Sequence, residues 1–206
     1  MDVARPYSVV SHPLDGSILH VLTGTTEGLT GRRIAELAAR TQEGTRKALG
    51  RLVEAGLVER QEAGNSILYE LNRRHLAAPA VEQLVDLRRA LVRQLTETLE
   101  GWKPRPAHAS MFGSAARGDG DVRSDIDLFI VRPASVPADD TGWREQSDRL
   151  PVEVHQWTGN HANLVEVTEA ALGDLRRRRP AIVEAIEDDA ITLVGRDARA
   201  LLGSED

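Results

Sequence analysis

The sequence predicts an α+β protein with two domains and a long helix between them. Residues 14–72 show three helical patterns followed by a two-stranded hairpin, and residues 79–102 show one long helical pattern. The remainder alternates short apolar strands with helices. We expect domains at residues 1–76 and 105–206, with the linker helix at 77–104. The length of 206 residues suits two such domains.

The composition is that of a globular protein, with 41% hydrophobic and 28% charged residues. There is no cysteine, which excludes disulfides and thiolate metal sites. The first ten residues lack the pattern of a signal peptide, and no apolar run approaches the roughly 20 residues that span a bilayer. We therefore expect a cytoplasmic protein with no membrane partner.

The first domain is predicted to contain three helices and a hairpin. Thr30 and Thr41 are suitable N-caps, and Gly56 ends the helix that begins after Thr41. Gly64-Asn65 suits a hairpin turn, and the residues that follow, from Ser66 to Leu71, alternate between apolar and polar. This order of elements is typical of small DNA-binding domains.

The stretch TRKALGRLVEAGLVERQEAGNSILYELN resembles the recognition helix and wing of winged helix-turn-helix regulators of the ArsR and MarR types. The resemblance implies that residues 41–55 enter the major groove of double-stranded DNA. It assigns base contacts to Gln42, Thr45 and Arg46, and backbone contacts to Arg32, Arg33, Lys47, Arg51 and Asn65. Residues 28–60 carry seven Lys and Arg against four Asp and Glu, although the chain has a net charge of −6. A winged helix that only contacts proteins is the alternative.

The segment between the two domains has a heptad pattern. Pro79 can begin a helix, and apolar residues then recur every three, four or seven positions up to Trp102. Such a stripe predicts a homodimer through paired linker helices. Packing of the helix on the chain's own two domains is the alternative.

Two aspartates lie on a predicted strand of the second domain. Because side chains alternate along a strand, Asp125 and Asp127 point to one side, and Ile126 and Leu128 to the other. Two neighbouring carboxylates repel each other unless a cation lies between them. Hard oxygen ligands with open positions for water and phosphate suit Mg²⁺.

A phosphate-binding segment is predicted just before the aspartates. Gly113 permits close approach of a phosphate to the backbone, and Ser114 begins a short helix. Arg117 adds a positive charge, and Ser124 precedes the aspartate pair. Together these residues predict a site for a nucleoside triphosphate.

The string GSAARGDGDVRSDIDLFIV resembles the signature of nucleotidyltransferases of the DNA polymerase beta superfamily, especially the minimal members and the aminoglycoside nucleotidyltransferases. The resemblance covers roughly residues 105–200. It implies a mixed sheet flanked by helices, bound Mg²⁺ and transfer of a nucleotide to a hydroxyl. It also calls for a third carboxylate as metal ligand and general base. Glu166 is the expected residue, although Asp is commoner in the family, and Glu153 is the alternative.

Taken together, the two resemblances predict a transcriptional regulator that carries a Mg²⁺-dependent nucleotidyltransferase domain. The acceptor hydroxyl is expected on a partner protein, as in antitoxin-like members of the superfamily. The alternative is a DNA-binding regulator whose second domain senses a nucleotide without transferring it. Modification of an aminoglycoside is less expected, because the winged helix would then have no use.

Overall fold

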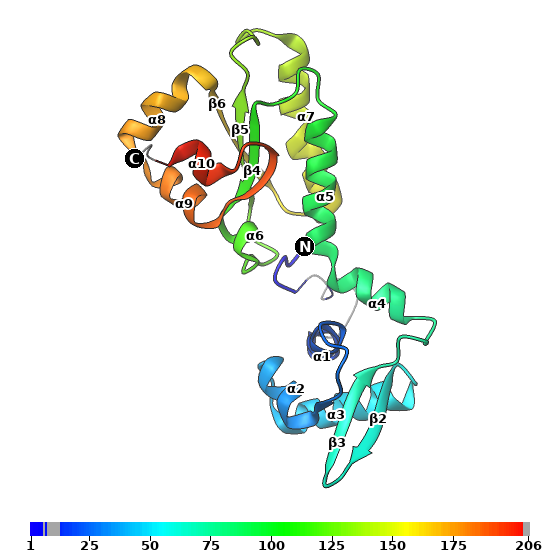
Figure 1. Cartoon of the computed structure of the whole chain (residues 1–206). Helices are drawn as coiled ribbons and strands as arrows, with labels where there is room; N and C mark the ends of the chain where they lie inside the picture. The colour runs from blue at the N-terminus through cyan, green and yellow to red at the C-terminus, as the bar shows by residue number, and fades with distance from the viewer. Residues whose placement is uncertain (6, 8–12, 204–206) are drawn as a thin grey trace. The chain divides into compact units, whose positions relative to one another are not determined.

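The computed structural model describes residues 1–5, 7 and 13–203. The chain divides into two compact units (Figure 1): residues 5–87, called here the N-terminal unit, and residues 1–4 with 88–206, the C-terminal unit. The division falls inside the segment where the sequence predicted a linker helix. No helix in the described ranges is long and apolar enough to cross a membrane.

The N-terminal unit packs helices against a small antiparallel sheet with strand order β1-β3-β2. Its core is built from apolar side chains such as Ile18, Ile34 and Leu49. The order of helices and hairpin agrees with the sequence prediction. The elements are α1 (Pro13–Thr23), β1 (Leu29–Thr30), α2 (Gly31–Leu37), α3 (Gln42–Glu54), β2 (Val58–Ala63), β3 (Ser66–Leu71) and α4 (Ala78–Val85).

Local chemistry explains where these elements begin and turn. The Thr30 hydroxyl accepts a hydrogen bond from the backbone N–H of Arg33, and Thr41 caps α3 in the same way. Gly64 adopts a positive φ of 60° in the turn between β2 and β3, where a residue with a side chain would be strained.

The single linker helix expected at 77–104 is two helices, α4 and α5 (Leu87–Glu100), with Asp86 between them. Ala78 and Val81 belong to the core of the N-terminal unit, whereas Leu95 and Leu99 belong to the core of the C-terminal unit. The helix breaks because its two halves bury their apolar residues in different cores. The heptad stripe therefore packs within the chain, and the homodimer stays a prediction.

The C-terminal unit is a mixed four-stranded sheet with strand order β6-β5-β4-β7. Strands β4 and β5 are antiparallel, as are β4 and β7, whereas β5 and β6 run parallel. The remaining elements are β4 (His108–Phe112), α6 (Gly113–Arg117), β5 (Ile126–Arg132), α7 (Thr141–Thr158), β6 (Ala162–Thr168), η2 (Glu169–Ala171), α8 (Leu172–Arg178), α9 (Ala181–Asp189), β7 (Ile191–Gly195) and α10 (Ala198–Leu202).

Helices cover both faces of this sheet (Figure 1). On one face, Leu128 and Ile130 share a core with residues of α5 and α7. On the other face, Phe129 and Val131 share a core with residues of α8, α9 and α10. The alternation of side chains along β5 thus assigns each residue of this strand to one of two helical layers.

Candidate functional site

The aspartate pair lies at the start of β5, where this strand runs beside β4 and β6. Asp127 pairs with Phe112 of β4 and with Asn163 of β6. Asp127 lies on the face of Phe129 and Val131 by alternation along β5, and Asp125 directly precedes the strand. The two carboxylates are close enough for one amide group to bond both: Asn163 Nδ2 lies 3.0 Å from Asp125 Oδ2 and 3.2 Å from Asp127 Oδ1.

Gly113 lies directly against this pair, at the junction of β4 and α6. Its φ of +70° is in the left-handed region. A Cβ atom at this position would lie 2.7 Å from Asp127 Oδ2, closer than van der Waals contact allows. Glycine therefore keeps open the space beside the carboxylate that a phosphate or a cation would need.

The loop between α6 and β5 is held by its own hydrogen bonds. Asp121 accepts from the backbone N–H of Arg123 and from the Ser124 hydroxyl, and these two bonds lower the pKa of the Asp121 carboxyl. Asn160 Nδ2 donates to the carbonyl oxygens of Asp121 and Ser124, at 3.2 and 2.9 Å. The Ser124 side chain predicted to bind nucleotide thus also orders the loop that leads into Asp125.

Arg117, predicted to contact phosphate, is engaged by two carboxylates. Its guanidinium lies 3.0 Å from Asp119 Oδ2 and 2.6 Å from Asp189 Oδ2, and both bonds raise the pKa of Arg117. The side chain is about half exposed, so a phosphate has to compete with these partners for it.

The predicted third carboxylate does not reach the aspartate pair. Glu166 pairs with Ile130, and its side chain points to the opposite face of the sheet. There Oε2 accepts a hydrogen bond from Trp143 Nε1 at 2.8 Å, and Oε1 lies 3.2 Å from Arg132 Nε. Glu166 therefore stabilises the contact between β6 and α7 and is not placed to bind the same cation.

Glu153 does not replace it. This residue lies on α7 rather than on a strand, and it forms an ion pair with Arg149 at 3.2 Å. Its helix covers the face of Leu128 and Ile130. The residue beside the aspartates on the neighbouring strand is Asn163, which was not among the residues predicted from the sequence to form the site.

The pair fits one hard divalent cation. Two carboxylates are ligands that Mg²⁺ accepts, and the glycine beside them leaves room for phosphate oxygens. Within residues 1–5, 7 and 13–203, no group of three or more His, Cys, Asp or Glu side chains could hold a metal ion. The site thus has fewer negative ligands than the sequence predicted.

In the N-terminal unit, the cations predicted to contact DNA carry acidic partners. Arg46 and Lys47 pair with Glu43, at 2.9 and 3.4 Å, and Arg51 lies 2.5 Å from Asp15. Arg32 and Arg33 both pair with Glu36. These pairs are solvent-exposed, so each contributes little energy and can be exchanged for a phosphate.

Thr45 does not face outward as predicted. It is fully buried, because it lies three and four residues before the core residues Ala48 and Leu49 on the same side of α3. Gln42, Arg46 and Asn65 are exposed. Gln42 and Arg46 line one hollow of about 300 Å³ together with Arg32, so the structure brings three of the predicted DNA contacts together.

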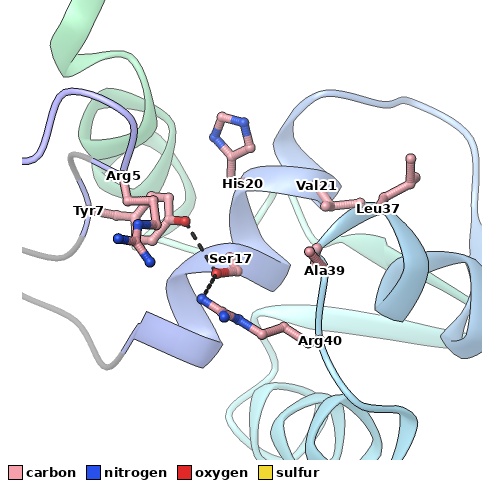
Figure 2. Close-up of a pocket in the computed structure, with 9 residues that line it drawn as sticks. Arg5, Tyr7, Ser17, His20, Val21, Leu37, Ala39 and Arg40 are labelled. Carbon is pink, nitrogen blue, oxygen red and sulfur yellow. Dashed lines mark hydrogen bonds between the residues drawn. The ribbon is translucent and has the colours of Figure 1, made fainter. Parts of the chain in front are cut away.

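A separate pocket of about 240 Å³ lies between α1 and the end of α2 (Figure 2). At its polar end, Ser17 Oγ lies 3.2 Å from Tyr7 Oη and accepts a hydrogen bond from Arg40 Nη2 at 3.1 Å. Val21 and Leu37 form its apolar side. None of the residues predicted to contact DNA lines this pocket.

Three solved structures match part of this chain. A toxin-antitoxin complex with AMP-PNP matches at 16% identity and a TM-score of 0.37, over 54% of this chain and 80% of that one. RV1404 of Mycobacterium tuberculosis matches at 20% identity and a TM-score of 0.35, over 46% of this chain and 67% of that one. ZitR of Lactococcus lactis, a zinc-responsive MarR family member, matches at 23% identity and a TM-score of 0.32, over 43% of this chain and 62% of that one. Likenesses this distant carry no functional weight.

The search of curated proteins returned no match. The family model described as "Nucleotidyltransferase domain" matches residues 91–191, a span that runs from α5 to the start of β7 and includes Gly113, Asp125, Asp127 and Asn163. This part of the chain is therefore similar to nucleotidyltransferase domains.

Proposed function

We propose that the chain is a DNA-binding regulator whose C-terminal unit binds a nucleoside triphosphate with Mg²⁺ and transfers a nucleotide to a hydroxyl. The observation that carries the proposal is the pair Asp125 and Asp127 at the start of β5, both within hydrogen-bond reach of Asn163 and beside a glycine that leaves space for phosphate. The match of residues 91–191 to a nucleotidyltransferase domain supports it. A partner protein is the proposed source of the acceptor hydroxyl.

In the proposed reaction, the acceptor oxygen forms a bond to the α-phosphorus and the bond to the bridging oxygen of the β-phosphate breaks. Pyrophosphate leaves, and the proton of the hydroxyl passes to solvent. Asp125 and Asp127 hold the cation, which offsets the charge on the phosphates. Gly113 lets the triphosphate approach the backbone, and the ordered loop through Ser124 keeps Asp125 in place.

The N-terminal unit is proposed to bind double-stranded DNA as a winged helix. The proposed domains of the chain are residues 1–76 and 105–206. Support comes from the exposed Gln42 and Arg46 on α3 and from Asn65 at the turn of the hairpin. On binding, DNA phosphates would replace the acidic side chains as partners of the basic residues. The affinity for DNA should therefore fall as the salt concentration rises.

A second candidate function is nucleotide sensing without transfer. The observation that favours it is the neutral amide of Asn163 beside the aspartates, with Glu166 on the opposite face. General-base catalysis typically contributes about 10²–10⁴-fold, and the described residues place no carboxylate beside the pair to provide it.

Labelled triphosphates distinguish the two candidates. With Mg²⁺ and candidate partner proteins, transfer predicts that label from the α-phosphate remains on the acceptor while label from the γ-phosphate leaves with pyrophosphate. Sensing predicts that neither label is transferred and that the triphosphate changes the affinity of the protein for DNA. Label retained from the γ-phosphate instead would contradict nucleotidyl transfer.

A further inference from the structure

Asn163 occupies the position on β6 that faces the aspartate pair. In the parallel pairing of β5 with β6 it lies directly opposite Asp127. Its Nδ2 donates to one oxygen of each carboxylate, at 3.0 Å to Asp125 and 3.2 Å to Asp127. The amide thus bridges the two groups on the side where a shared cation would bind.

The bridge has a clear physical role when no cation is bound. Two ionised carboxylates held on one face of a strand repel each other. The two N–H groups of one amide satisfy an oxygen of each and lessen this repulsion. A cation and the amide N–H groups cannot contact the same oxygens from the same side, so binding of a cation requires the amide to move.

An asparagine can make this change within its own side chain. A half-turn about the last side-chain bond exchanges Nδ2 with Oδ1, and the carbonyl oxygen then faces the carboxylates. Asparagine carbonyl oxygens are ordinary ligands of Mg²⁺ and Ca²⁺. No backbone movement is needed, since Asn163 is exposed at the start of its strand.

We propose that Asn163 is the third protein ligand of the cation site, and that its amide changes from hydrogen-bond donor to metal ligand when the cation binds. The inference rests on the proposed binding of a cation by Asp125 and Asp127. Two carboxylates and a neutral amide carry a charge of −2, which one divalent cation balances. A carboxylate at position 163 would instead leave an excess negative charge and favour tighter binding of the metal.

The test compares the whole protein with Asn163→Asp, Asn163→Leu and a control, Glu166→Gln, on the opposite face of the same strand. Trp102, Trp143 and Trp157 all belong to the C-terminal unit, so tryptophan fluorescence reports its unfolding. In EDTA, Asn163→Asp should melt roughly 2–8 °C below wild type, because it loses the bridging bonds and adds a like charge. Saturating Mg²⁺ or Mn²⁺ should remove that difference.

Calorimetry with Mn²⁺ measures the ligand role directly. Asn163→Leu, which keeps a similar shape without the carbonyl oxygen, should bind Mn²⁺ about 10-fold or more weakly than wild type. Asn163→Asp should bind it more tightly, and Glu166→Gln should match wild type. The proposal is overturned if Asn163→Leu binds Mn²⁺ like wild type, or if Asn163→Asp melts like wild type in EDTA.

The two levels of the hypothesis fail differently. If wild type binds Mn²⁺ and the variants behave as expected, but no nucleoside triphosphate binds, the proposed function fails while the ligand role of Asn163 stands. If the triphosphate binds with Mg²⁺ and the Asn163 variants bind the metal unchanged, only the role of Asn163 fails. Should Asn163→Asp not fold without metal, Asn163→Leu still decides between these outcomes.

Discussion

Substitution of Gly113 tests whether the open space beside Asp127 is required for nucleotide binding. Gly113→Ala places a Cβ atom 2.7 Å from Asp127 Oδ2, at a φ of +70°. The left-handed backbone costs a residue with a side chain roughly 1–2 kcal/mol. Asp127 can relieve the close contact by rotating its carboxylate, so the main damage should be to the cation site rather than to the fold.

Gly159→Ala is the matched control. Gly159 belongs to the same unit and has a φ of +75°, but the nearest atom to its Cβ position is 4.0 Å away. Both variants should lose about 1–2 kcal/mol of unfolding free energy, measured by urea denaturation with tryptophan fluorescence. Only Gly113→Ala should lose affinity for the triphosphate with Mg²⁺, by about 10-fold or more, which equals about 1.4 kcal/mol. Equal affinities in the two variants would refute the reasoning.

Two further predictions concern DNA and pH. Arg46→Ala should weaken binding of a specific duplex by about 1–3 kcal/mol in fluorescence anisotropy. Arg144→Ala in the C-terminal unit should leave the affinity for the duplex unchanged. An affinity for DNA that does not fall as the salt concentration rises would contradict the DNA-binding role. Burial lowers the pKa of His108 below its ordinary value of 6.5, so the unfolded chain takes up a proton first and the C-terminal unit should lose stability as pH falls below 6.5. His108→Gln should flatten that dependence in fluorescence-monitored urea unfolding. A C-terminal unit that instead loses stability as the pH rises through this range would contradict the prediction.

The helices, the hairpin and the aspartate pair were predictable because they depend on local patterns. Thr30 and Thr41 cap helices through bonds to residues three positions ahead. Asp125 and Asp127 share a face because a strand alternates regardless of its neighbours. The burial of Thr45 could also have been found, since its spacing to Ala48 and Leu49 places it on the apolar side of α3.

The third member of the site was not predictable from the same patterns. The third carboxylate was sought on the strand with the sequence NLVEV, residues 163–167. Both faces of this strand carry apolar residues, so the sequence does not say whether Asn163 or Glu166 faces the aspartates. That choice depends on the register of β6 against β5, which is set by pairing between residues far apart in the sequence. A shift of one residue in this register would exchange the two faces of β6. The division of one apolar stripe between two cores at Asp86 likewise depends on tertiary packing.

Calorimetric titration of a non-hydrolysable nucleoside triphosphate into wild type and into the double variant Asp125→Asn/Asp127→Asn tests the central proposal most directly. Tryptophan fluorescence first confirms that the double variant is folded. We expect wild type to bind the triphosphate with Mg²⁺ and not in EDTA, and the double variant to bind in neither condition, because two carboxylates are needed to hold the cation against the phosphates. Mg²⁺-dependent binding of equal strength in both proteins would contradict the assignment of Asp125 and Asp127 as the cation site.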